Sequence, residues 1–431
     1  MSSYIDEKIR MKRVVFFALV VSFLFFFFNM IGVSALFYIG LAGLLVSMLA
    51  LSEKELFLLI SFLMPNLFMF KQIGSESAIL GYFFVLISIK TVIMNFQRTV
   101  RINLFFIVHI AFTLLTCTIY ADQNLLIGLV RFVFNFSLFS YCASLFSRDR
   151  EIKQVVKMYF AGIIIAVLMG IVFHSANGDL YNGLFAGVNS GRNYFGAVIT
   201  PAITIIILYF LEKRVSFSET ILYGLTMILC MISIVLSGSR TSVLSLAIPI
   251  LLCLFCLIRS LWKFNKKLLP LIILLAVFGI VVYVNYQDAL LNLLARFSED
   301  DVKTGNNRFD LWEYYIKQTL RSPISFMLGS GSINDNKLVE HNTVVQCIYQ
   351  LGVIGFISFL GIILKAFRKI TKGYKLSIIT IFPLLSVIIP YCGINGLYAD
   401  QLSYLIVLCA LIMRDFSITK NVDTANCNVT C

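Results

Sequence analysis

The sequence predicts an all-α integral membrane protein, a polytopic helical bundle of about 12–14 transmembrane helices. Composition is the first reason: 59% of the 431 residues are hydrophobic, 13% are charged, and the mean hydropathy is +0.91. Soluble domains carry roughly 25% charged residues. The second reason is that the apolar residues gather in runs of about 20, the length that a helix needs to cross a bilayer.

Positive charge is distributed as in a membrane protein, not as in a nucleic-acid-binding protein. The net charge is +13, yet Lys and Arg gather in short links between apolar runs, as the positive-inside rule predicts. When helices are counted from a cytoplasmic N-terminus, all strongly basic links fall on the cytoplasmic side: 8–13, 98–101, 148–153, 213–214, 259–267 and 365–375.

The apolar runs predict the helices in order. The run at 14–33 is too long for a signal-peptide core, so we interpret it as a retained first helix. Segment 1–286 is expected to hold eleven helices, with the others at 33–51, 55–70, 78–95, 102–120, 124–146, 155–173, 195–211, 219–236, 242–258 and 268–286.

A long polar segment, 287–342, interrupts the helices and is expected to form a large periplasmic loop between helices 11 and 12. Segment 343–414 holds the last three helices, at 343–365, 376–390 and 398–413, and 415–431 forms a cytoplasmic tail. No soluble domain of ordinary size and no internal repeat is visible.

Arg131 lies a third of the way along the predicted helix at 124–146. An Arg inside a membrane usually faces a cavity or a partner, but it can also extend to the surface. The residues alone leave both interpretations open.

Arg240 lies in the tight external link SGSRTS, where Gly238 permits a sharp turn and Thr241 or Ser242 can cap the next helix. A guanidinium at a helix N-terminus just outside the membrane suits a phosphate, through the helix dipole and its planar fork of donors. Contact with lipid head groups is the alternative.

Segment 308–320 predicts an amphipathic helix on the outer membrane surface. Arg308, at its start, is a second candidate phosphate ligand, and Arg321 and Lys317 are candidate head-group contacts. Apolar residues recur along the segment at helical spacing: Phe309, Trp312, Ile316 and Leu320.

His341 directly precedes the predicted helix at 343–365. An imidazole takes up a proton near neutral pH, so His341 is the candidate general base. Glu340 is adjacent, and a hydrogen-bonded interfacial His is the alternative. His109 and His174 are expected to be structural.

We expect no cofactor and no metal ion. The acidic run at 299–301 is interpreted as a solvated face, and Cys253 and Cys256, a CxxC within an apolar run, as packing residues. No Walker motif and no dinucleotide-binding glycine pattern is present. The energy for any reaction must therefore come from the substrate.

Three motifs together resemble the O-antigen ligase/polymerase superfamily. They are GSRTS at 238–242, Arg308 with Trp312 followed by SPISFMLGSG at 322–331, and His341-Asn342 followed after nine residues by GVIG at 352–355. They occur in the order of the family, with the long loop external. The resemblance covers roughly residues 180–413.

The resemblance implies a GT-C-like glycosyltransferase of the bacterial inner membrane that acts at its periplasmic face. By that resemblance, Arg240 and Arg308 bind the undecaprenyl diphosphate of a lipid-linked oligosaccharide donor, and His341 deprotonates an acceptor hydroxyl. Arg192, Asn342, Arg321 and Trp312 are possible further substrate contacts. A chain-length regulator and a flippase are implied as partners in polysaccharide biosynthesis.

Within the superfamily, the high helix count and the Phe-rich sequence favour an O-antigen (repeat-unit) polymerase of the Wzy type. A ligase, which joins the finished chain to lipid A-core, is the first alternative. A flippase of lipid-linked oligosaccharide is the second, but it predicts mid-membrane ionisable residues and related halves. A purely structural scaffold gives no reason for the polar loop.

The predicted topology is testable in segment 287–342. A single cysteine placed at Asn334 should react in intact cells with a reagent that does not cross the inner membrane. The parent for this test lacks reactive native cysteines. Labelling that required lysis would contradict the assignment of the loop to the outside.

Overall fold

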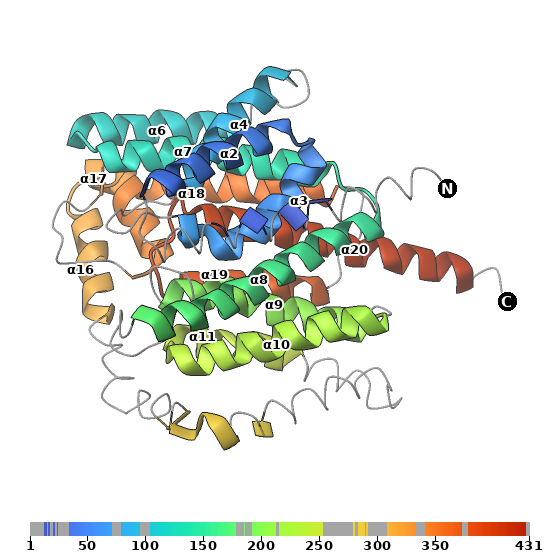
Figure 1. Ribbon diagram of the computed structural model, residues 1–431. Helices are drawn as coiled ribbons and strands as arrows, with labels where there is room; N and C mark the ends of the chain where they lie inside the picture. Colours follow the sequence, from blue (N-terminus) through green and yellow to red (C-terminus); the bar gives the residue numbers. More distant parts are fainter. Residues whose placement is uncertain are drawn as a thin grey trace.

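In the computed structural model the chain is a helical bundle, and the described part contains no strand (Figure 1). The structure describes residues 34–70, 79–94, 104–177, 192–212, 215–252, 308–332, 341–372 and 378–427, together with isolated positions between 13 and 24, at 185 and between 279 and 291. The prediction of an all-α polytopic membrane protein is confirmed.

The N-terminal half supplies α2 (Ser34–Ala50), α3 (Glu53–Leu63), η1 (Met64–Phe70), α4 (Leu80–Met94), α6 (Leu104–Tyr120), α7 (Gln123–Ser144) and α8 (Asp149–Asn177). The C-terminal half supplies α9 (Arg192–Glu212), α10 (Phe217–Ser237), α11 (Arg240–Ser245), α16 (Arg308–Leu320), α17 (Pro323–Leu328), α18 (Thr343–Ile370), η4 (Ile378–Ile381), α19 (Phe382–Tyr391) and α20 (Asp400–Cys427).

Five described helices are long and apolar enough to cross a bilayer: Gln123–Ser144, Asp149–Val172, Arg192–Leu211, Phe217–Ser237 and Thr343–Ile370. Five shorter apolar helices accompany them: Phe37–Ala50, Leu80–Met94, Leu104–Tyr120, Arg240–Leu252 and Ile379–Tyr391. Nearly the whole span of α9 is buried, so α9 lies at the centre of the bundle. The count of 12–14 spans remains a prediction.

Several predicted helices differ in extent from the structure, such as α20, which continues to Cys427 through most of the expected tail, and two are interrupted next to a proline. The helix expected at 55–70 ends at Leu63 and continues as the 3-10 helix η1, because Pro65 has no N–H for the helical ladder. The side chain of Asn66 donates instead to the carbonyls of Phe62 (3.0 Å) and Gly162 (2.9 Å). The helix expected at 376–390 is divided into η4 and α19, and a proline opens the first turn of α19.

The helix ends form two groups, as the basic links predict. At one end, Lys54 pairs with Glu151 (2.7 Å) and Lys157 pairs with Glu219 (2.8 Å), so the starts of α3, α8 and α10 lie together. The helices α16 and α17 lie at the opposite end, where α16 runs across the direction of the long helices (Figure 1). Which end faces the cytoplasm remains a prediction.

Arg131 has a partner inside the bundle. Its guanidinium pairs with Asp400, the first residue of α20, and Asn135 donates to the other carboxylate oxygen at 2.7 Å. Asp400 is almost fully buried. Of the two interpretations of Arg131, the structure therefore supports contact with a partner and not extension to the surface.

The helix α18 is sharply kinked at Gly352, and the segment that follows α17 packs against it there. Gly352 has φ +67° and ψ −175°, a conformation open essentially only to glycine. The N–H groups of Ser330 and Gly331 donate to the carbonyls of Tyr349 (2.7 Å) and Gln350 (3.3 Å). The first glycine of GVIG therefore permits a backbone-to-backbone contact that anchors the end of the long loop.

Replacing Gly352 with Ala should lower the unfolding temperature of the purified protein. The strained φ/ψ costs about 1–3 kcal/mol, and the new Cβ would lie 2.4 Å from the carbonyl oxygen of Met327. Gly43→Ala in α2 is the control, because no atom lies within 4 Å of its Cβ position. Equal unfolding temperatures for the two variants would show that α18 is not constrained at Gly352.

Candidate functional site

Arg240, Arg308 and His341 each lie at the start of a helix. Arg240 is the first residue of α11, Arg308 is the first residue of α16, and His341 lies two residues before α18. The three helices come from segments up to a hundred residues apart, so only packing can bring their N-termini together. Contacts with the segment between α19 and α20 bring the starts of α16 and α18 together.

The turn before Arg240 is built from two residues. Gly238 ends α10 with φ 56°, the left-handed conformation that glycine adopts at little cost. Ser239 then caps α11, and its hydroxyl accepts from the N–H of Ser242 at 3.3 Å. The predicted tight turn is confirmed. The prediction of Thr241 or Ser242 as the cap is wrong, since the helix begins earlier, at Arg240.

The start of α9 lies against this turn. The hydroxyl of Ser239 donates to the side-chain oxygen of Asn193 at 2.8 Å. A Cβ on Gly196 would overlap Ser242, so α9 and α11 approach closely at this point. Arg192, the first residue of α9, thus begins a helix beside the one that Arg240 begins.

Arg308 is held by the link between α19 and α20. Its guanidinium donates to the carbonyl oxygen of Gly393 at 3.3 Å. Further along α16, the ring of Tyr315 packs on Tyr349 of α18, with centroids 4.8 Å apart. The predicted helix is confirmed, with Tyr315 and Thr319 buried, whereas the apolar residues Phe309, Ile316 and Leu320 are exposed. Its place on the outer membrane surface stays a prediction.

His341 is exposed and sits in a left-handed backbone conformation with φ 49°. The next residue, Asn342, is the cap of α18, and its side-chain oxygen accepts from the N–H groups of Val344 (2.9 Å) and Val345 (3.2 Å). Thr343 donates to the carbonyl of Ile394 at 2.8 Å. Asn342 and Thr343 thereby fix the backbone that presents the imidazole.

Electrostatics link the three residues directly. Burial and the neighbouring guanidinium of Arg240 lower the pKa of Arg308. Burial and the charge of Arg308 lower the pKa of His341 below its ordinary value of 6.5. Within the described part of the chain Arg308 forms no ion pair with a carboxylate. Two guanidinium groups that lie this close together favour an anionic ligand.

The link between α19 and α20, residues 392–399, forms hydrogen bonds with α16, α18 and α9. Its carbonyls accept from Arg308, from Thr343 and, at Asn395, from the hydroxyl of Tyr194 at 2.6 Å. Sequence reasoning interpreted this segment only as a connection between helices. The turn residues Gly393 and Gly396 were the available signal, since they mark irregular backbone between two apolar runs.

The remaining sequence candidates are placed less centrally. Trp312 lies one turn after Arg308 and packs edge-on against Phe309, with centroids 5.4 Å apart. Arg321 is exposed just beyond the other end of α16, roughly 20 Å along the helix from Arg308. The structure therefore brings Trp312, but not Arg321, close to the start of α16.

His109 is buried in α6 and is structural, as expected. One ring nitrogen is 2.9 Å from the hydroxyl of Ser358 and the other is 2.8 Å from the hydroxyl of Tyr398. This network joins α6, α18 and the link before α20. Glu340, the acidic run at 299–301 and the CxxC at 253–256 lie outside the described residues.

A comparison with known protein families matches the part of the chain that holds Arg240, Arg308 and His341. Residues 225–360 match the O-antigen ligase family (Wzy_C). The match supports the O-antigen ligase/polymerase superfamily for this region of the chain. The match includes the second half of α10, all of α11, α16 and α17, and α18 up to residue 360, and so includes Arg240, Arg308 and His341. No curated protein matches the chain. The family consists of glycosyltransferase-like enzymes, and the chain is a multi-pass membrane protein.

The charge of Arg308 should be measurable at His341. In Arg308→Gln the pKa of His341 should rise toward 6.5, because a neighbouring cation no longer opposes protonation. The measurement is an NMR titration of labelled imidazole carbons, which is practicable because the chain has only three histidines. His341→Gln assigns the signal.

Lys317→Gln is the matched control for this titration. It removes one positive charge from the same helix, but Lys317 is exposed, pairs with Glu313 and lies roughly 13 Å along α16 from Arg308. The pKa of His341 should stay unchanged in this variant. An equal rise in both variants would mean that total charge, and not the contact with Arg308, sets the pKa.

Proposed function

We propose that the protein is an inverting glycosyltransferase, an O-antigen or surface-polysaccharide polymerase of the bacterial inner membrane. It would transfer the growing glycan from undecaprenyl diphosphate to a new lipid-linked repeat unit at the periplasmic face. The observation that supports this most is the convergence of Arg240, Arg308 and His341 at one end of the bundle, within a region that matches the O-antigen ligase family.

The two arginines suit a diphosphate. Each guanidinium can donate two parallel hydrogen bonds to phosphate oxygens, and a helix N-terminus adds favourable dipole. Burial, and next the repulsion from the guanidinium of Arg240, lower the pKa of Arg308. A bound diphosphate would relieve that repulsion, and it would do so most strongly when the leaving group carries its full charge.

His341 suits the role of general base. Burial and the charge of Arg308 lower its pKa, which favours the neutral imidazole that can accept a proton, and its side chain is exposed to an incoming acceptor. In a single displacement, the acceptor hydroxyl oxygen attacks the anomeric carbon while the imidazole takes its proton. The bond from that carbon to the diphosphate breaks with its electron pair on the diphosphate. One attack from the opposite face gives inversion.

Ligation to lipid A-core is the second candidate, because the matched family carries the ligase description. Both reactions use the same donor and the same displacement. They differ only in the acceptor, so the three residues would keep their roles in either.

The test is a gel of surface polysaccharide from cells that lack this gene and carry wild type or a variant. His341→Gln should abolish chain extension, since loss of a general base typically costs about 10²–10⁴ in rate. Arg240→Lys should reduce extension on the order of 10–100-fold, because an ammonium lacks the planar fork. Lys317→Gln is the control, and each variant is checked for membrane abundance.

The products separate the candidates. A single repeat unit on lipid A-core, in the deletion strain and with His341→Gln, supports the polymerase. Long chains accumulating on undecaprenyl diphosphate would instead support the ligase. Unpolymerised repeats held on the cytoplasmic face would support a flippase and overturn both transferase proposals. Normal chains with His341→Gln would remove the histidine as base.

A further inference from the structure

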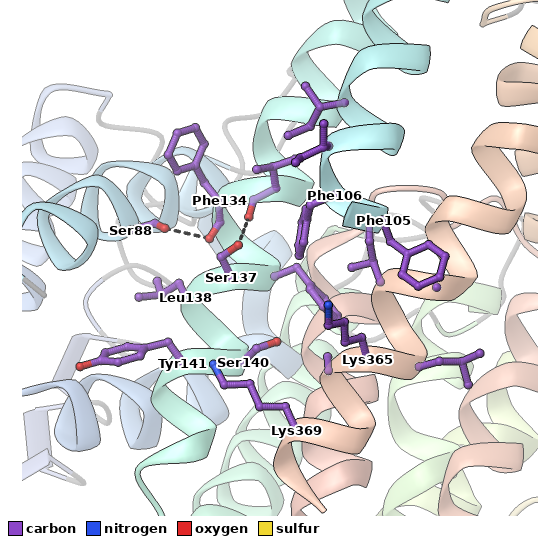
Figure 2. A pocket seen from close by; sticks show the side chains of 18 of the residues that line it. Ser88, Phe105, Phe106, Phe134, Ser137, Leu138, Ser140, Tyr141, Lys365 and Lys369 are labelled. Atoms are coloured by element: carbon purple, nitrogen blue, oxygen red, sulfur yellow. Dashed lines mark hydrogen bonds between the residues drawn. The ribbon is translucent and has the colours of Figure 1, made fainter. Parts of the chain in front are cut away.

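A second site lies at the end of the bundle away from His341. A groove of about 1010 Å³ opens between α4, α6, α7 and the C-terminal half of α18 (Figure 2). Its volume is at the upper limit of ordinary ligand pockets, roughly 300–1,000 Å³. It is formed by the last turns of α4, α7 and α18 and the first turns of α6, whereas the site of Arg240 and Arg308 lies at the N-terminal end of α18.

The walls of the groove are apolar. Aromatic and aliphatic side chains form them, including Phe105, Phe106, Phe134, Phe136, Leu138 and Ile362. Three hydroxyls in the walls are satisfied by backbone carbonyls: Ser88 donates to Phe134 (2.9 Å), Thr91 to Ile87 (2.9 Å) and Ser137 to Val133 (2.5 Å). The groove therefore offers a surface for hydrocarbon, with few hydrogen-bonding groups left for water.

Four cations line one end of the groove. They follow helical spacing along a single stretch of α18 and its end, at Lys365, Arg368, Lys369 and Lys372, and all four are exposed. Figure 2 shows Lys365 and Lys369 extending from α18 toward α7. The described lining residues include no carboxylate.

Two hydroxyl groups lie at the same end. Ser140 and Tyr141, near the end of α7, line the groove close to Lys369 (Figure 2). The hydroxyl of Ser140 has no hydrogen-bond partner among the described residues. Cations and a hydroxyl donor beside an apolar channel form a pattern that suits a phosphate ester attached to a hydrocarbon chain.

We propose that this groove binds an anionic phospholipid of the cytoplasmic leaflet, such as phosphatidylglycerol. One acyl chain lies against the apolar walls, and Lys365 and Lys369 hold the phosphate. The basic link at 365–375 is one of those that the positive-inside rule assigns to the cytoplasm, where anionic lipid head groups are concentrated. A free phosphate would leave the apolar walls unused, and an apolar protein helix would leave the four cations without an anionic partner in the groove.

The lipid would act as a packing element. Two elements that line the groove continue to the other end of the bundle: α18 begins next to His341, and Thr116 of α6 donates to the carbonyl of Leu328 at the end of α17 (2.6 Å). The proposal concerns a different surface from the transferase site, so it stands or fails independently of the proposed function.

The experiment uses the full-length protein in nanodiscs of phosphatidylglycerol and phosphatidylcholine in equal amounts. After extraction into mild detergent, native mass spectrometry weighs the intact protein with its retained lipids. Wild type should retain one phosphatidylglycerol in preference to phosphatidylcholine. Lys365→Gln/Lys369→Gln should retain it roughly tenfold less.

Two further variants sharpen the result. Arg148→Gln/Arg150→Gln removes the same charge from an exposed link at the same end, outside the groove, and should retain the lipid as wild type does. Ser137→Phe fills the apolar part while keeping all four cations, and it should lose the lipid. Size-exclusion profiles establish that each variant is folded.

Several outcomes would overturn the proposal. Equal retention of the two lipids would mean that the cations do not select the head group. Retention unchanged in Lys365→Gln/Lys369→Gln or in Ser137→Phe would place the lipid elsewhere. Displacement of the lipid by inorganic phosphate alone would indicate an anion site without a chain. A retained second protein chain in place of lipid would mean that the groove is a helix-packing surface.

Discussion

The ion pair between Arg131 and Asp400 is the interaction on which the candidate site depends. A charge inside the membrane is costly unless it is paired, so Arg131 of α7 holds the first residue of α20 in place. The residues just before Asp400 form the 392–399 link. Its carbonyls accept from Arg308, Thr343 and Tyr194, so a pair within the bundle positions groups at its surface.

Charge is arranged differently at the two ends of α18. At its N-terminal end, burial and next the charge of Arg240 lower the pKa of Arg308, and His341 stands beside Arg308. At its C-terminal end, four cations line an apolar groove. The kink at Gly352 separates the two halves. Both ends suit phosphate-bearing lipids, the first through guanidinium forks and the second through point charges next to hydrocarbon walls.

Close backbone contacts explain why the motifs contain glycine. A Cβ at Gly352 would overlap the backbone of Met327 and Gly329, and a Cβ at Gly329 would overlap Gln350. The two glycines that sequence reasoning treated as family signatures are thus the two faces of one contact. That contact brings the end of the long loop against α18, which in turn limits where α16 can present Arg308.

Local pattern by itself determined the class of protein, most of the helices, the helix α16 and the tight turn before Arg240, and it supplied the residues that we propose for the site. These follow from hydrophobic periodicity, turn chemistry and the distribution of basic links, which depend on neighbouring residues only. Tertiary structure alone decided the partner of Arg131, the role of the 392–399 link, the kink at Gly352 and the groove between α4, α6, α7 and α18. Each of these joins segments far apart in the chain, such as Arg308 with Gly393 or Arg131 with Asp400, and no periodic pattern specifies which distant groups will meet. The cap of α11 is another example. It is Ser239 and not the predicted Thr241 or Ser242, and the hydroxyl of Ser239 is also bonded to Asn193 of α9.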